Sequence, residues 1–124
     1  MKKILLLITL LLFSFIATAQ DSFVRRYTKM YSSNPEKKSA CNVNVVFNSQ
    51  ETDADIVMYF VGGKTFKFYR TETKVERGVD KNGESYQLVI CINDEGTKVG
   101  LQIYDEDSTF RILFLDGSLL EFYN

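Results

Sequence analysis

The chain of 124 residues contains no histidine and no tryptophan, and it has only one proline and two cysteines. The lack of histidine excludes Ser-His and Cys-His nucleophile pairs, and it also excludes the histidine ligands on which most zinc and copper sites depend. Since histidine is the commonest general base, only carboxylate or Lys/Tyr chemistry remains. We therefore expect no enzymatic activity, no catalytic residues, no metal and no cofactor.

The acidic residues gather in segments that read as turns. They are Glu51, Asp53 and Asp55 in one, Asp94 and Glu95 in another, and Asp105, Glu106 and Asp107 in a third. Turns favour Asp for backbone reasons alone, so we interpret these acids as solvated loop residues. The alternatives are a glycosidase-like pair of acids and a calcium site at Asp105 and Asp107, but the spacing there lacks a full EF-hand pattern.

Positive charge is also scarce. The chain has 15 basic and 16 acidic residues, and removal of residues 1–19 leaves 13 against 16, a net charge of −3. A protein that binds phosphate backbones usually displays a basic face. The longest cluster, Glu36-Lys37-Lys38 beside Pro35, reads as a solvated turn. We expect no nucleic-acid partner.

Residues 1–19 have the pattern of a secretory signal peptide. Lys2 and Lys3 precede an apolar run from Ile4 to Ile16, and Ala17-Thr18-Ala19 is the small-x-small pattern of a cleavage site. The run is shorter than the roughly 20 residues of a membrane span, and no cysteine lies at the cleavage site to carry a lipid. We expect a bacterial protein exported to the periplasm or the extracellular space, with no membrane anchor and one domain over residues 20–124.

The exported compartment permits a disulfide between Cys41 and Cys91. Residue parity opposes it, because Cys41 shares its side with Val43 and Val45, whereas Cys91 lies opposite Leu88 and Ile90. We expect two free thiols on opposite faces.

Turn dipeptides divide the rest of the chain into β-rich segments. Gly62-Gly63, Asn82-Gly83 and Asp116-Gly117 are hairpin signals, and the acidic segments at 93–96 and 105–108 add two further turns. Such short connections allow only antiparallel neighbours. The strands are expected at about 42–48, 55–61, 64–77, 85–93, 97–104, 109–115 and 118–123. Residues 23–31 alternate as a strand would, although their apolar set also fits a helix, and we favour the strand.

The fold class is therefore all-β, a single antiparallel meander of seven to eight strands rolled into a small barrel or barrel-like sandwich. Two-residue turns would pair Arg77 with Leu88 and Tyr59 with Phe66, which places Leu88, Ile90 and Ile92 in the core. Phe66 and Phe68 are even-numbered, whereas Thr73, Val75 and Val79 are odd-numbered. The sequence thus predicts a β-bulge or break near Arg70 to Glu72.

A second apolar side remains on this meander. We expect it to be partly exposed and to form a possible binding patch for a protein, a small apolar ligand or a second copy in a homodimer. The patch consists of Ile56, Met58, Phe60, Tyr69, Leu113 and Phe122.

Size, export and hairpin order together resemble small lipocalin-like barrels and periplasmic lysozyme inhibitors in outline. The chain is thus expected to be a non-enzymatic binding or inhibitor-type domain, or alternatively a carrier of a small apolar ligand in a barrel cavity. A cavity lined by residues such as Tyr59, Phe66 and Phe68 would favour the carrier. A filled core with exposed Leu113 and Phe122 would favour the binding domain.

Overall fold

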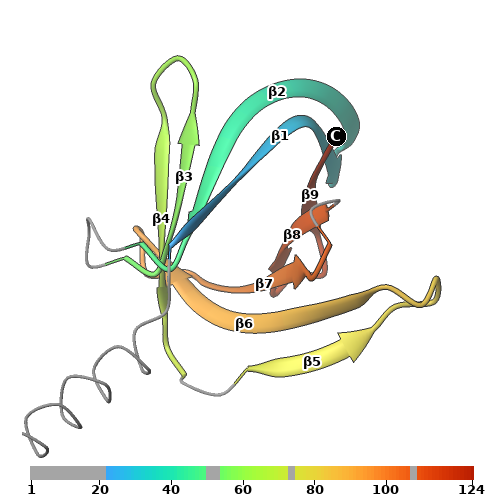
Figure 1. Ribbon diagram of the computed structural model, residues 1–124. Coiled ribbons are helices and arrows are strands. Elements are labelled where there is room, and N and C mark those ends of the chain that lie inside the picture. Colours follow the sequence, from blue (N-terminus) through green and yellow to red (C-terminus); the bar gives the residue numbers. More distant parts are fainter. Residues whose placement is uncertain (1–21, 50–53, 73–74, 107–108) are drawn as a thin grey trace, which may run out of the picture.

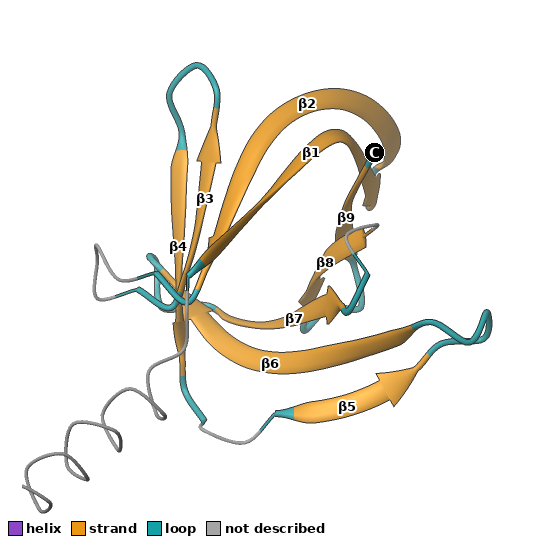
Figure 2. Cartoon of the chain, viewed as in Figure 1, coloured by secondary structure: helices purple, strands orange, loops and turns teal. Residues whose placement is uncertain are grey.

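The computed structural model describes residues 22–49, 54–72, 75–106 and 109–124. The signal peptide expected at residues 1–19 lies outside them. The described residues form strands and turns without a helix (Figures 1 and 2), and so none of them belongs to an apolar helix that could cross a membrane. The strands are β1 (Phe23–Ser33), β2 (Glu36–Phe47), β3 (Ile56–Phe60), β4 (Thr65–Arg70), β5 (Glu76–Val79), β6 (Ser85–Asn93), β7 (Lys98–Tyr104), β8 (Thr109–Phe114) and β9 (Leu119–Tyr123).

These strands form one antiparallel sheet in the order β4-β3-β2-β1-β9-β8-β7-β6-β5. The sheet closes on itself because β4 also pairs with β6, through Phe68, Tyr69 and Arg70. Eight strands thus make a closed barrel, and β5 is an additional strand on β6. The expected all-β antiparallel barrel is confirmed, and residues 23–31 belong to a strand rather than a helix. β2 begins at Glu36, earlier than expected, so Lys37 and Lys38 lie exposed on a strand.

Four hairpins share one turn geometry. In the β5–β6 turn, the Asp80 amide donates to the Glu84 carbonyl at 3.0 Å, and the Gly83 amide donates to the Asp80 carbonyl at 3.0 Å. Three residues therefore form the loop, and Gly83 has a φ of 82°. This is a turn closed by a left-handed glycine, which costs glycine little. The same bond pattern closes the β3–β4, β6–β7 and β8–β9 loops, with glycine at the third position in each: Gly63, Gly96 and Gly117.

The three-residue loops correct the predicted register. We assumed two-residue turns, and one extra loop residue moves every cross-strand partner by one position. Arg77 accordingly pairs with Gln87, not Leu88, and Met58, not Tyr59, pairs with Phe66. The inward-facing side of β6 is therefore that of Val89 and Cys91, while Leu88, Ile90 and Ile92 are half-buried on the outer side.

The predicted irregularity after Arg70 is confirmed as a break between β4 and β5. Both strands pair with β6, Arg70 opposite Cys91 and Glu76 opposite Leu88. Arg70 and Glu76 are thus six residues apart, whereas their partners on β6 are only three residues apart. Because the difference is odd, inward-facing residues are even-numbered before the break and odd-numbered after it. Phe68 before the break and Val75 after it both pack on the core.

A column of aromatic rings runs through the interior. Phe23 stacks on Phe47 with ring centroids 4.9 Å apart, and Phe47 meets Phe110 edge-on at 5.7 Å. Phe110 then stacks on Phe122 at 6.0 Å, and Phe122 contacts Phe60 at 6.1 Å. Such offset and edge-on contacts are the favourable arrangements of aromatic pairs. The column joins the two ends of the barrel through its core.

Both cysteines are free. The expectation that they face opposite ways is wrong, because Cys91 is fully buried in the core and Cys41 packs against the same core. The Cys41 thiol contacts the Tyr27 carbonyl oxygen at 3.8 Å. The register shift on β6 is the reason for the error.

Candidate functional site: an apolar cavity at the turn end

A cavity of about 710 Å³ opens at the end of the barrel formed by the β3–β4 and β6–β7 turns. β6 ends at Asn93, opposite Phe68, so the first residues of β4, Thr65 to Lys67, rise beyond it. Figure 1 shows the β3–β4 hairpin standing above the rest of the barrel. The mouth lies between this hairpin and the shorter wall.

The walls of the cavity are apolar and its rim is polar. Two methionines, Met30 and Met58, contribute flexible side chains that adapt to irregular shapes. The remaining apolar wall comes from Phe60, Phe66, Phe68, Phe114, Phe122, Val99, Ile112 and Leu120, and the rim includes Lys64, Thr65, Asn93, Asp94 and Glu95. Apolar walls with a few polar groups at the edge are typical of small-molecule sites.

The structure brings together only part of the predicted patch. Met58, Phe60 and Phe122 line the cavity, with Met58 and Phe122 each 1% exposed. Ile56 is also inside, but it lines a second cavity at the opposite end. Tyr69 and Leu113 are half-buried on the outer side of the wall, since their neighbours Phe68 and Ile112 face inward. The expectation of an exposed patch is therefore corrected.

The reason for this correction is again the strand register. On β3, Ile56, Met58 and Phe60 pair with Phe47, Val45 and Val43, which are core residues of β2. Even-numbered residues of β3 must therefore point inward. Sequence reasoning missed Met30, Val99, Ile112 and Phe114 as lining residues. Glycine at the third position of four loops was the signal that could have corrected the register.

The second cavity, of about 380 Å³, is polar, and residues that line it form hydrogen bonds with one another. Arg25 crosses this end of the barrel, and its Nη1 donates to the Tyr104 carbonyl oxygen at 2.6 Å. The Arg25 guanidinium also lies 5.4 Å from the ring centres of Phe23 and Phe47. A carboxylate oxygen of Asp55 accepts the Arg70 amide at 2.7 Å. These contacts tie strands together, and we assign this end a structural role.

Arg77 and Asp105 form an ion pair near this second cavity. The Arg77 side chain is 57% exposed, so its charge reaches solvent while it pairs with the carboxylate of Asp105.

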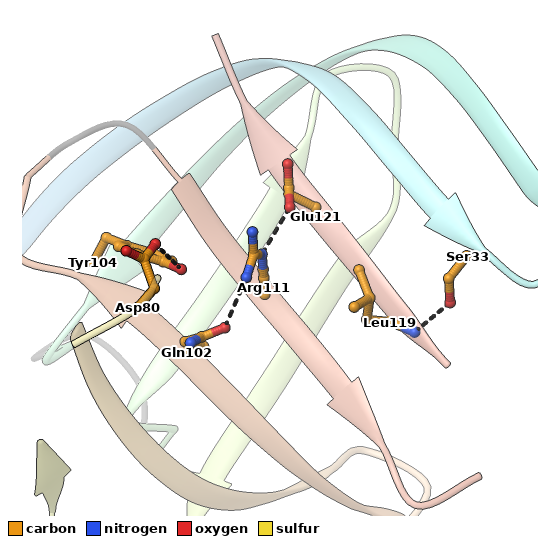
Figure 3. Close-up of polar contacts among 7 residues, drawn as sticks. All are labelled: Ser33, Asp80, Gln102, Tyr104, Arg111, Leu119 and Glu121. Carbon is orange, nitrogen blue, oxygen red and sulfur yellow. Dashed lines mark hydrogen bonds and ion pairs between the residues drawn. The ribbon is translucent and has the colours of Figure 1, made fainter. Parts of the chain in front are cut away.

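A polar network on the outer wall joins β7, β8 and β9 (Figure 3). Arg111 Nε lies 2.7 Å from the Glu121 carboxylate, and Arg111 Nη1 donates to the Gln102 side-chain oxygen at 3.4 Å. The Tyr104 hydroxyl donates to Asp80 at 3.1 Å, which ties the β5–β6 turn to β7. Burial raises the pKa of Tyr104. The pKa of Asp80 is lowered, mainly because the backbone amide of Glu84 donates a hydrogen bond to its carboxylate. These polar groups form hydrogen bonds with one another and so hold the neighbouring strands of the wall together.

No group of acidic or cysteine side chains within the described ranges is placed to hold a metal ion. Comparison with protein-family models, curated proteins and solved structures finds no match.

Proposed function

We propose that this protein is a small exported, non-enzymatic binding protein that carries a small apolar ligand in the turn-end cavity. The observation that supports the proposal is the cavity itself, about 710 Å³ with an aromatic and aliphatic wall. Binding pockets for small molecules commonly have volumes of roughly 300–1,000 Å³. A filled barrel would offer no such space.

The chemistry of the wall defines the class of ligand. The charged residues of the cavity, Lys64, Asp94 and Glu95, belong to the turns at the rim. An ionised group deep in the cavity would lose its hydration without gaining an opposite charge. The ligand body is therefore neutral and apolar, and any polar group it carries lies at the mouth.

The alternative of an inhibitor-type domain that binds a protein depends on an exposed apolar patch. Met58 and Phe122, which would belong to that patch, are 1% exposed, and Leu113 is half-buried. Phe66 and Phe68, by contrast, line the cavity. These positions favour the carrier.

A fluorescence titration tests the proposal. N-phenylnaphthylamine is a neutral apolar probe whose emission rises in dry surroundings, and the lack of tryptophan keeps the protein background low. The key variant is Phe66→Asp, because Phe66 lines the cavity yet is 43% exposed, so the fold tolerates a charge there. We expect the probe to bind the wild type and to bind Phe66→Asp about tenfold more weakly, through lost apolar contact and a charge at the mouth.

Tyr59→Asp is the matched control. Tyr59 is 37% exposed and pairs with Thr65 on the same hairpin, but it lies outside the cavity lining. Its substitution should leave probe affinity unchanged. Equal loss in both variants, or no probe binding by the wild type, would contradict the proposal.

A further inference from the structure

Two exposed apolar side chains occupy equivalent positions in two turns. Val61 is 65% exposed and Leu115 is 81% exposed, and each is the first residue of a three-residue hairpin loop. In the other two loops of the same geometry, this position holds Lys81 and Asp94. The turn itself therefore does not require an apolar residue there. Neither the turn geometry nor packing in the core accounts for the apolar surface that Val61 and Leu115 expose to water.

Both side chains lie in turns that adjoin the cavity. Val61 belongs to its lining, and Leu115 directly follows Phe114, which also lines it. Phe66, 43% exposed, adds apolar surface at the same opening. Exposed apolar side chains on two turns thus adjoin the apolar cavity.

We propose that Val61 and Leu115 dip into a lipid bilayer, so that the cavity exchanges its ligand directly with the membrane. This inference rests on the proposed carrier function and names the source of the ligand. A ligand apolar enough for this cavity dissolves poorly in water and concentrates in lipid. Contact between the mouth and a bilayer spares it the passage through solvent.

The shape of the surface favours a bilayer over a protein partner. A stable protein interface buries about 800 Å² on each side with a well-packed apolar centre. Val61 and Leu115 are instead separate tips on two turns, with the polar residues Lys64 and Asp116 beside them. A fluid bilayer accepts such protruding side chains without a complementary rigid surface.

The charge of the mouth predicts the kind of lipid contact. Lys64, Asp94, Glu95 and Asp116 lie in the turns around the opening, so both signs are present. A mixed surface has no strong attraction to anionic lipids. Contact is therefore apolar, independent of anionic lipid and insensitive to salt.

Probe transfer between phosphatidylcholine vesicles tests the proposal. Protein loaded with N-phenylnaphthylamine is mixed with acceptor vesicles, and the rate of probe release is measured against vesicle concentration. Transfer by contact gives a rate that rises with vesicle concentration, whereas release into water gives a constant rate. We expect a rising rate for the wild type, and a constant rate, about tenfold slower, for the double variant Val61→Asp/Leu115→Asp.

The control is the double variant Val24→Asp/Val79→Asp, which makes the same chemical change at residues that are 60% and 63% exposed. Val24 is near the start of β1 and Val79 at the end of β5, and neither lines the cavity. This control should transfer probe like the wild type. The control should also keep the probe affinity of the wild type in the absence of vesicles. Because Val61 lines the cavity, Val61→Asp/Leu115→Asp is judged by how its release rate depends on vesicle concentration.

Three results would overturn the membrane contact: a vesicle-independent rate for the wild type, equal loss in the control, or a wild-type dimer that Val61→Asp/Leu115→Asp dissociates. The last result would assign the tips to a second copy of the chain. If the probe does not bind at all, the carrier function fails separately. Co-sedimentation of ligand-free protein with phosphatidylcholine vesicles then decides the docking alone, and absence of the protein from the pellet refutes it.

Discussion

Cys91 illustrates how strongly a single position in this barrel is determined by its surroundings. Its side chain is fully buried, and burial, with a smaller contribution from the charge of Asp55, raises the pKa of its thiol to about 12. Arg70 acts in the opposite direction but does not offset the burial. Burial also raises the pKa of Cys41. Neither thiol is activated, which agrees with the absence of any histidine beside them.

We predict that Cys91 does not react with iodoacetamide in the native protein at pH 8. With a pKa of about 12, only about one thiol in ten thousand is ionised at that pH, and the folded wall also blocks access. A Cys41→Ser variant isolates Cys91 for mass spectrometry. It should gain no label when folded and one label in urea.

The same shift has a consequence for stability. The folded state holds the Cys91 proton more tightly than the unfolded state does. The contribution of this thiol to the free energy of unfolding is therefore complete below the unfolded pKa of about 8.5 and is lost as the pH rises toward 12. Rapid labelling of the native Cys41→Ser variant at pH 8 would show that Cys91 is not in the core.

At the scale of the element, the turns decide the register of the sheet. Each three-residue loop places a glycine at its third position, and in the β5–β6 turn the Asp80 side chain accepts the amides of Asn82 and Glu84 at 2.9 and 3.0 Å. Asn93 accepts the amides of Glu95 and Thr97 in the same way in the β6–β7 turn. Side-chain oxygens at these positions hold the loop in its turn conformation.

We predict that Gly83→Ala lowers the free energy of unfolding by about 1 kcal/mol. Gly83 has a φ of 82°, and a side chain in the left-handed region is strained even though no atom lies within 4 Å of the added Cβ. Gly100→Ala is the control, since its Cβ would lie at ordinary contact distance, 3.5 Å, from Leu88. Urea denaturation measures both variants. Equal stability of Gly83→Ala and wild type would mean that the loop does not depend on a left-handed glycine.

Sequence reasoning located the strands and turns better than it located their partners. Alternation and turn dipeptides placed the hairpins, and the change from even Phe68 to odd Val75 revealed the break between β4 and β5. The register failed because Asn82-Gly83 suits both a two-residue turn and the end of a three-residue loop. The one additional loop residue is the reason that Val89, and not the expected Ile90, lies in the core.

At the scale of the whole molecule, the cavity depends on strand lengths that no local pattern encodes. β4 pairs with both β3 and β6, but β6 ends opposite Phe68, so the mouth opens where the β3–β4 hairpin continues alone. Sequence therefore indicated Met58, Phe60 and Phe122 as apolar but could not place them around a common space. Their juxtaposition follows from barrel closure.

We predict that Met58→Lys unfolds the protein and that Ile90→Lys does not. Met58 is 1% exposed inside the barrel, so an added charge would be buried without a partner and cost about 4 kcal/mol or more. Ile90 is half-buried on the outer side of β6, where a lysine ammonium reaches water. Thermal unfolding followed by circular dichroism compares the two variants. A lower melting temperature for Ile90→Lys than for Met58→Lys would place the core on the opposite side of β6.

The pairing of β1 with β9 also determines how the chain can fold. Apart from this pairing and that of β4 with β6, neighbours in the sheet are neighbours in sequence, and their hairpins can form as soon as both strands exist. β1 pairs through residues such as Lys29 and Tyr123, from opposite ends of the described chain. Contacts between such distant segments form slowly, because a long loop must close first. A chain that emerges from its amino terminus therefore leaves one edge of β1 open until its last strand has appeared.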